Sequence, residues 1–228
     1  MFFGKRISLL VLAIFLLAPA AVASSFTTTL DFNSQGWVNS AGAGNGALNP
    51  NNAYTGNFAG LRYNSWANFD LSSVPGTVVS AQLRVFTTAY LVGAGPYELG
   101  VYDVNTSFAD LDGQTGGIFA YNDLGSGHFY ASAFFGDGTT LTLALSNQAV
   151  TDLNASLGGD FRVGYTNITL NAVPALSSDN ALYTFTSTLI VNSVIGDAEQ
   201  VPEPSSIVLL GAGIVVLLTV VPHISAKR

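Results

Sequence analysis

The stretch from residue 79 to residue 87 reads Val-Ser-Ala-Gln-Leu-Arg-Val-Phe-Thr. Its odd-numbered positions hold Val, Ala, Leu, Val and Thr, and its even-numbered positions hold Ser, Gln, Arg and Phe. Successive side chains of a strand point to opposite faces, so this alternation predicts a β-strand with its odd-numbered side chains inward. The pattern recurs at residues 140–145, where three leucines alternate with Thr, Thr and Ala.

Working outward from these two segments, we predict seven further strands, because short β-like runs are separated by Gly, Asn, Asp and Pro. They comprise residues 26–32, 65–71, 97–104, 117–121, 128–135, 161–170 and 182–192. About nine strands between residues 26 and 192 predict an all-β fold, an antiparallel β-sandwich or jelly roll.

One short helix is expected at residues 149–157. Val150, Leu153 and Leu157 recur there at helical spacing. Asn147 can cap the start of this helix, and Gly158 is placed to end it. The helix is expected to cover one end of the sandwich.

The charge and cysteine content exclude several classes of function. The chain has no cysteine, which excludes disulfides, thiolate metal sites and a cysteine nucleophile. Between residues 24 and 201, three arginines stand against thirteen acidic residues, which gives a formal net charge of −10. Nucleic-acid affinity depends on Lys and Arg neutralising phosphates, so we expect no nucleic-acid binding.

The first 23 residues have the three regions of a secretory signal peptide. Lys5 and Arg6 precede an apolar run, and the small residues Ala21 and Ala23 stand before Ser24. The apolar run of about 11 residues is too short to span a hydrocarbon core of about 30 Å. We therefore expect signal peptidase to cut after Ala23, so that the mature chain begins at Ser24.

The other end of the chain holds a motif, an apolar segment and a basic end, in that order. The motif is Val201-Pro202-Glu203-Pro204, and the chain closes with two basic residues. An apolar helix over residues 205–221 would be about 26 Å long, enough for a locally thinned bilayer. The positive-inside rule keeps the basic end in the cytoplasm and places the preceding domain across the membrane.

These features predict the organisation of the whole chain. The expected parts are a signal peptide at 1–23, a β-sandwich ectodomain at 24–198, a linker with the Pro-Glu-Pro motif at 199–204, a transmembrane helix at 205–222 and a basic cytoplasmic end at 223–228.

The tail, residues 201–228, resembles a PEP-CTERM sorting signal, which is also catalogued as an ice-binding protein C-terminal motif. The resemblance implies that an exosortase, a membrane transpeptidase-like protease, recognises Pro202, Glu203 and Pro204. It also implies export across the inner membrane of a Gram-negative bacterium, transient anchoring, and delivery to the cell surface or extracellular matrix. Two prolines keep this backbone extended and out of a helix, as a cut site requires. The family usually shows a denser Arg-rich end than Lys227-Arg228.

Parts of the ectodomain carry a less specific resemblance. Residues 68–85 resemble a strand pair common in secreted carbohydrate-binding-like jelly rolls. Residues 123–127 and 158–161 are similar to segments in the ectodomains of other PEP-CTERM proteins. This resemblance implies a fold more than a function.

Few residues point to catalysis or to a cofactor. His128 is the only histidine before the tail, and neither G-x-S-x-G nor H-E-x-x-H occurs. We therefore expect no catalytic triad and no zinc site, and interpret His128 as a residue at a strand start. Asp110, Asp112 and the Asp137-Gly138 pair have the oxygen-rich, Gly-containing composition of a calcium loop, but Asp-Gly also forms turns. The sequence leaves a structural calcium ion as an alternative, and no other cofactor is expected.

The leading hypothesis is a non-catalytic exported surface or matrix protein whose ectodomain interacts with exopolysaccharide or other matrix components. Aromatic residues that can stack on sugars are Trp37, Tyr54, Tyr63, Trp66, Tyr90, Tyr97, Tyr102 and Tyr130. One alternative is a secreted carbohydrate-active hydrolase that pairs Glu98 with a loop Asp. The other is a structural, self-associating matrix subunit that joins through exposed strand edges.

Overall fold

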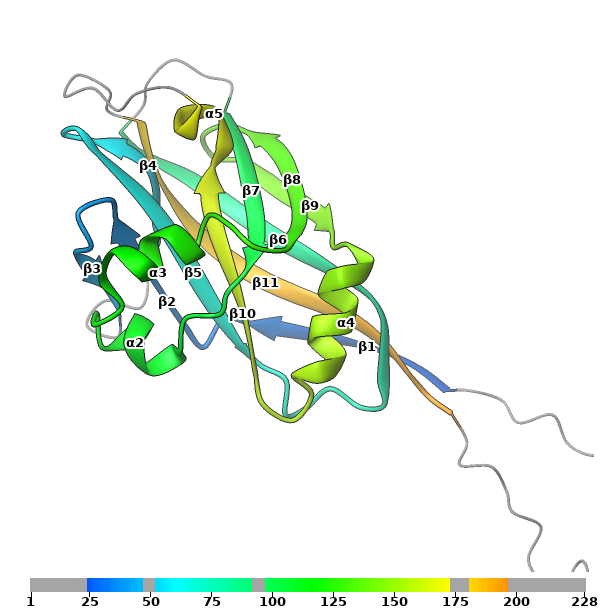
Figure 1. The fold of residues 1–228 in the computed structure, drawn as a ribbon. Coiled ribbons are helices and arrows are strands. Elements are labelled where there is room, and N and C mark those ends of the chain that lie inside the picture. Colours follow the sequence, from blue (N-terminus) through cyan, green and yellow to red (C-terminus); the bar gives the residue numbers. More distant parts are fainter. Residues whose placement is uncertain (1–23, 47–51, 92–96, 173–180, 197–228) are drawn as a thin grey trace, which may run out of the picture. The chain divides into compact units, whose positions relative to one another are not determined.

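The computed structural model describes residues 24–46, 52–91, 97–172 and 181–196 (Figure 1). Within it, Ser25–Ile195 cluster as one unit. The predicted signal peptide, the Pro-Glu-Pro motif and the predicted transmembrane helix lie outside the described residues. In the described ranges, no helix has the length and apolar character needed to cross a membrane.

The described strands join in one antiparallel sheet, so the all-β antiparallel class is confirmed. They are β1 (Ser24–Asp31), β2 (Ser34–Asn39), β3 (Gly44–Asn45), β4 (Tyr54–Phe58), β5 (Leu61–Asp70), β6 (Thr77–Leu91), β7 (Tyr97–Asp103), β8 (Phe129–Phe135), β9 (Thr140–Ala144), β10 (Asp160–Asn167) and β11 (Ala181–Ile195). Their order is β8-β7-β10-β5-β4-β11-β6-β9, with β1 beside β11 and β2 beside both β3 and β5.

The sheet curls so strongly that β7 and β10 lie across β6 and β11, with the main core between them (Figure 1). Tyr165 of β10 stacks on Phe185 of β11 at a ring distance of 5.9 Å. Its hydroxyl donates a hydrogen bond to Ser187 Oγ at 2.7 Å, in the same interior. Burial raises the pKa of Tyr165, so the phenol stays protonated and able to donate. This face-to-face packing is the sandwich-like feature of the domain.

The alternation at residues 79–87 is confirmed except at its first residue. Ala81, Leu83, Val85 and Thr87 are buried, whereas Val79 is 54% exposed. The β6–β11 ladder shifts register beside Val79, so that Val78 faces the core in its place. A β-bulge of this kind inserts one extra residue and reverses the inward side from that point on.

The described part contains four helices where one was expected. The expected one is α4 (Asn147–Ala155), and its existence is confirmed. Its cap is Ser146 and not Asn147, because the Ser146 side chain accepts a hydrogen bond from the Ala149 backbone N–H. The predicted strand at 161–170 ends early, because Asn167 caps a one-turn helix, α5 (Ile168–Asn171).

The predicted strand at 117–121 is wrong, because α3 (Gly117–Asp123) occupies this segment. Together with α2 (Phe108–Asp112), it covers the outer side of β2 and β5 (Figure 1). Ala120 and Leu124 lie one helical turn apart and pack on Trp66 in a second, smaller core. Two buried positions in so short a helix make too little of a periodic pattern to distinguish it from a strand.

Strands β2, β3 and β4 were not predicted, because much of what they bury is polar. Gln35 is fully buried and donates its side-chain N–H to the Phe185 backbone carbonyl at 3.2 Å. Thr55 and Ser65 are also fully buried, and their hydroxyl oxygens lie 2.6 Å apart. Such strands lack the apolar alternation by which half-buried strands are found.

Candidate functional site

An open cleft of about 250 Å³ lies where β7 ends and where β8 and β10 begin. The C-terminal part of α4 forms one wall, through Asp152, Ala155 and Ser156. The charged and polar residues that line it include Asp103, His128, Tyr130, Asp152, Asp160 and Arg162. This cleft is the candidate functional site of the described domain.

The turn before β8 places His128 at the cleft. Gly127 has a φ of 92°, which a side chain would strain, and a Cβ there would collide with Asp103 Oδ1. That close approach lets the His128 backbone N–H donate to Asp103 Oδ1 at 2.6 Å. Asp103 therefore holds the start of β8 against the end of β7, and His128, expected at a strand start, lies in the turn one residue before β8.

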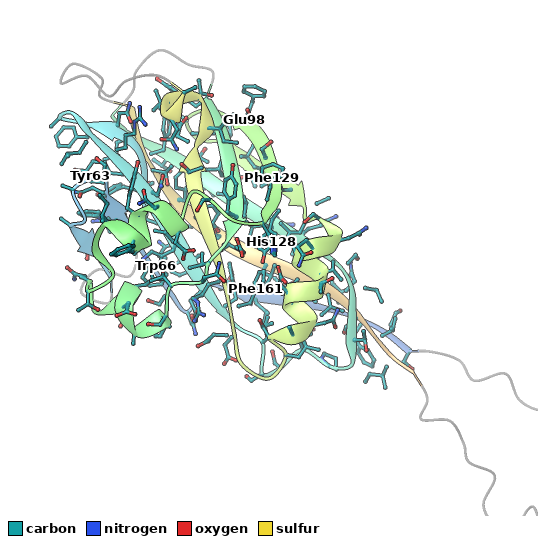
Figure 2. All side chains as sticks on the ribbon, in the orientation of Figure 1. Tyr63, Trp66, Glu98, His128, Phe129 and Phe161 are labelled. Carbon is teal, nitrogen blue, oxygen red and sulfur yellow. The ribbon has the colours of Figure 1, made fainter. Side chains whose placement is uncertain are left out.

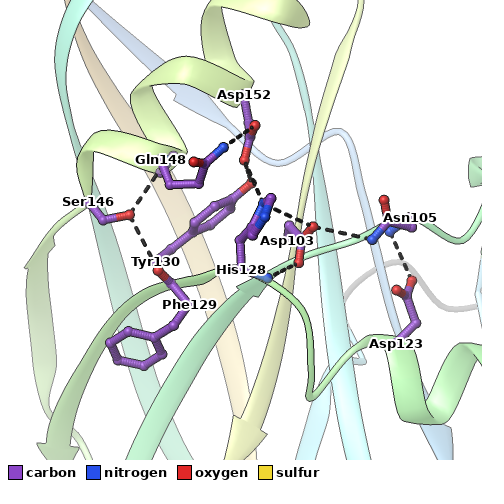
Figure 3. A network of polar contacts seen from close by, with 10 residues as sticks. Asp103, Asn105, Asp123, His128, Phe129, Tyr130, Ser146, Gln148 and Asp152 are labelled. Atoms are coloured by element: carbon purple, nitrogen blue, oxygen red, sulfur yellow. Dashed lines mark hydrogen bonds and ion pairs between the residues drawn. The ribbon is translucent and has the colours of Figure 1, made fainter.

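The His128 imidazole lies between two carboxylates (Figure 3). Its Nδ1 is 3.7 Å from Asp103 Oδ2 and 3.8 Å from Asp152 Oδ2. The ring is 60% exposed, and it becomes the positive partner of both carboxylates only when it is protonated. The three residues come from β7, α4 and the turn before β8, so folding alone brings them together.

Tyr130 ties α4 to β8 beneath this pair. Its hydroxyl donates to Asp152 Oδ2 at 2.7 Å, and Gln148 donates to Asp152 Oδ1 at 3.0 Å (Figure 3). The Tyr130 ring stacks on Phe161 at 5.9 Å. Burial and the nearby Asp152 carboxylate raise the pKa of Tyr130, so its hydroxyl acts as a donor.

Changing Tyr130 to Phe is expected to lower the free energy of unfolding by about 1–2 kcal/mol, because a hydrogen bond to a carboxylate is lost from a buried side chain. Urea denaturation of both proteins measures the difference. Tyr102→Phe on the neighbouring strand is the matched control, since no hydrogen bond of its hydroxyl is found in the described structure. Equal losses in the two variants would contradict a role for the Asp152 bond.

Arg162 supplies the positive charge of the cleft. Its side chain is half-buried and its Nε is enclosed without a hydrogen-bond partner. In the described ranges, no carboxylate lies within ion-pair distance of its guanidinium. Asp160, two residues earlier, accepts instead from Asn68 Nδ2 at 2.9 Å. The cleft thus presents carboxylates and a guanidinium that do not neutralise one another.

The structure does not bring the two calcium candidates together. Ser107 and Thr115 donate their hydroxyls to Asp110 at 2.6 and 2.8 Å, which lowers the pKa of Asp110. Asp112 accepts from Ser34 Oγ at 3.2 Å instead. Nowhere in the described residues are three or more His, Asp or Glu side chains grouped to hold a metal ion. Asp137 lies in the turn between β8 and β9.

The aromatic residues fall into buried and half-buried sets. Trp66, Tyr97 and Tyr130 are buried in the cores, so the expectation that they could stack on a sugar is wrong. Half-buried aromatics are Trp37, Tyr54, Tyr63 and Tyr102, whereas the Tyr90 side chain lies outside the described residues. Figure 2 shows Tyr63 on the side of β2 and β5, and Phe129 along β8. Phe129 is 48% exposed and contacts Tyr102 at 5.5 Å.

Glu98, the acid of the hydrolase alternative, lies on β7 well away from the turn at His128 (Figure 2). Its Oε1 accepts from Ser132 Oγ on β8 at 2.6 Å. The carboxylates that the structure does place on a shared partner are Asp103 and Asp152. The predicted strands gave no signal for Asp103, because the strand expected after residues 97–104 was 117–121, which is α3 in the structure. Asp152 enters the site through α4.

The comparison that bears on function concerns the tail. Residues 200–220 match the family model described as "PEP-CTERM protein-sorting motif". The predicted sorting motif, Val201-Pro202-Glu203-Pro204, lies inside the match, which confirms the resemblance. The sorting motif and a β-rich domain are thus both shown.

Three solved structures are distantly similar to this chain, and no curated protein matches it. BuGH86wt in complex with neoagarooctaose is 11% identical, with a TM-score of 0.34, over 78% of this chain and 20% of that one. The CBM22-1–GH10 modules of Clostridium thermocellum endo-1,4-β-D-xylanase 10B, complexed with xylohexaose, are 10% identical, with a TM-score of 0.29, over 77% and 29%. A mud crab tombus-like virus chain is 12% identical, with a TM-score of 0.29, over 80% and 86%. This chain spans less than a third of the first two, and similarity at this level carries no functional argument.

Proposed function

We propose that this chain is a non-catalytic, exported surface or matrix protein, processed by an exosortase, whose β-domain binds exopolysaccharide. The observation that carries the proposal is the sorting-motif match at residues 200–220. A PEP-CTERM sorting tail indicates export and membrane-associated sorting in Gram-negative bacteria. The arrangement of residues 1–23 and 201–228 supports the same route, with signal peptidase acting at the front and exosortase at the back.

The absence of catalysis is a separate part of the proposal. The ectodomain has one histidine, and its Nδ1 faces two carboxylates. Asp152 is already bonded by Tyr130 and Gln148, and Asp103 by the His128 backbone N–H. These hydrogen bonds give both carboxylates a structural role, Asp103 at the start of β8 and Asp152 between α4 and β8.

Mass analysis of the mature protein tests the proposal. The expected mass corresponds to a chain that begins at Ser24 and ends at or near the Pro202-Glu203-Pro204 motif, whether free or joined to another group. Incubation with a panel of polysaccharides is expected to release no reducing ends. A full-length chain recovered from the cytosol would contradict export, and turnover abolished by Glu98→Gln would favour the hydrolase.

A further inference from the structure

We propose that the cleft beside His128 binds one sugar residue of an uncharged glycan chain; this inference rests on the proposed matrix-binding function and names its site. The cleft lies at the meeting point of β7, β8, β10 and α4, all in the well-packed part of the domain (Figure 3). Two lining residues, Tyr130 and Phe161, belong to the main buried core, and a wall packed in this way loses little entropy on binding.

The size of the cleft suits a small ligand. Its volume of about 250 Å³ lies just below the range of about 300–1,000 Å³ typical for drug-sized molecules. His128 and Asp160 at the cleft are exposed, so the site is open to solvent. An open site of this volume can take one ring of a longer chain and let its neighbours extend outward.

The charges of the cleft argue against simple ions. Asp103, Asp152 and Asp160 would repel a small anion that approached Arg162. Arg162 in turn would repel a cation that approached the carboxylates. In the described part, moreover, no group of three His, Asp or Glu residues is arranged to hold a metal ion.

A hydroxyl-rich neutral ligand can bind the negative and the positive groups of the cleft at the same time. Each hydroxyl donates one hydrogen bond and accepts others, so it can donate to Asp160 and accept from Arg162. The Arg162 guanidinium has no carboxylate partner among the described residues, and the exposed Asp160 carboxylate has spare acceptor capacity beside its bond from Asn68. Hydrogen bonds to charged groups are stronger than neutral ones, and a polyol makes them without burying a charge of its own.

The test uses the mature, processed protein purified from the producing cells. Its binding is measured by calorimetry to neutral gluco-, manno- and galacto-oligosaccharides, to an oligogalacturonate and to a chitosan oligosaccharide. We expect at least one neutral oligosaccharide to bind more tightly than the charged two. Ala155→Phe fills the cleft, and Arg162→Gln removes its donor charge; each is expected to weaken that binding by about tenfold or more. Thr151→Phe is the matched control, because it adds the same ring one turn back on the exposed face of α4, outside the cleft.

The His128 ring gives a second readout, since it is the only histidine of the ectodomain. Its NMR signals, assigned with His128→Gln, are expected to shift on addition of the neutral oligosaccharide and to stay unchanged in Ala155→Phe. Neutral binding that survives both cleft variants would overturn the cleft assignment and leave the matrix role standing. Stronger binding of a charged oligosaccharide, or no binding of any neutral one, would also overturn it. An unprocessed cytosolic chain would instead reject the proposed function itself.

Discussion

A variant with alanine at Pro202, Glu203 and Pro204 is expected to stay uncut at its C-terminus and to remain in the membrane fraction. Proline disfavours helix at its own position and at the residue before it, which favours recognition of an extended motif by a protease, whereas alanine favours helix. We expect the amount of protein at the cell surface and in the matrix to fall by at least about tenfold, since each 1.4 kcal/mol of lost recognition corresponds to that factor. Fractionation and mass analysis measure both effects.

The control for this variant is a chain with alanine at Ser205 and Ser206, which changes the residues beside the motif and leaves Pro-Glu-Pro intact. It is expected to be processed normally. If the triple variant reached the surface with the wild-type mass, the motif would not be the cleavage signal in this protein.

The largest expected effect on stability comes from Phe185→Ala. Phe185 is 1% exposed, stacks on Tyr165 and contacts Phe135 at 5.9 Å, so its removal leaves a cavity between the two faces of the curled sheet. We expect the free energy of unfolding to fall by about 3–5 kcal/mol. That is a large share of the roughly 5–15 kcal/mol that stabilises a typical domain, and urea or thermal denaturation measures it.

Phe86→Ala is the matched control, because Phe86 lies on the neighbouring strand β6, opposite Thr186, and is 44% exposed. Its loss is expected to change stability by about 0.5 kcal/mol or less. Similar losses in the two variants would mean that Phe185 is not a packing centre.

Sequence patterns were sufficient where apolar and polar residues alternate strictly. Leu83 and Val85 of β6, and Leu143 and Leu145 at β9, are buried as predicted. The patterns failed where buried residues are polar, as with Gln35 of β2. They failed again at residues 117–121, where the large apolar side chain of Phe119 is 84% exposed on a helix.

The candidate cleft was beyond local patterns for a different reason. Its residues come from β7, the turn before β8, α4 and β10, and each taken alone has an ordinary local role. Asp152 is one polar residue on a short helix, and Arg162 is one outward residue on a strand. The cleft forms only when β7, α4 and β10 come together in the folded domain, whereas the tail is recognisable because its motif, apolar segment and basic end are consecutive.

The position of β11 has a consequence for when the domain can fold. β11 is the last of the described strands, yet it pairs with β1, β4 and β6, all from the first half of the domain. Thr27, for example, bonds to Asn192 across 165 residues. A chain that passes through a translocation channel from its N-terminus cannot close this sheet until residue 195 has emerged. Because these strands are far apart in the sequence, their pairing comes late. The polypeptide therefore stays unfolded while it passes through the channel, and the sheet closes after translocation.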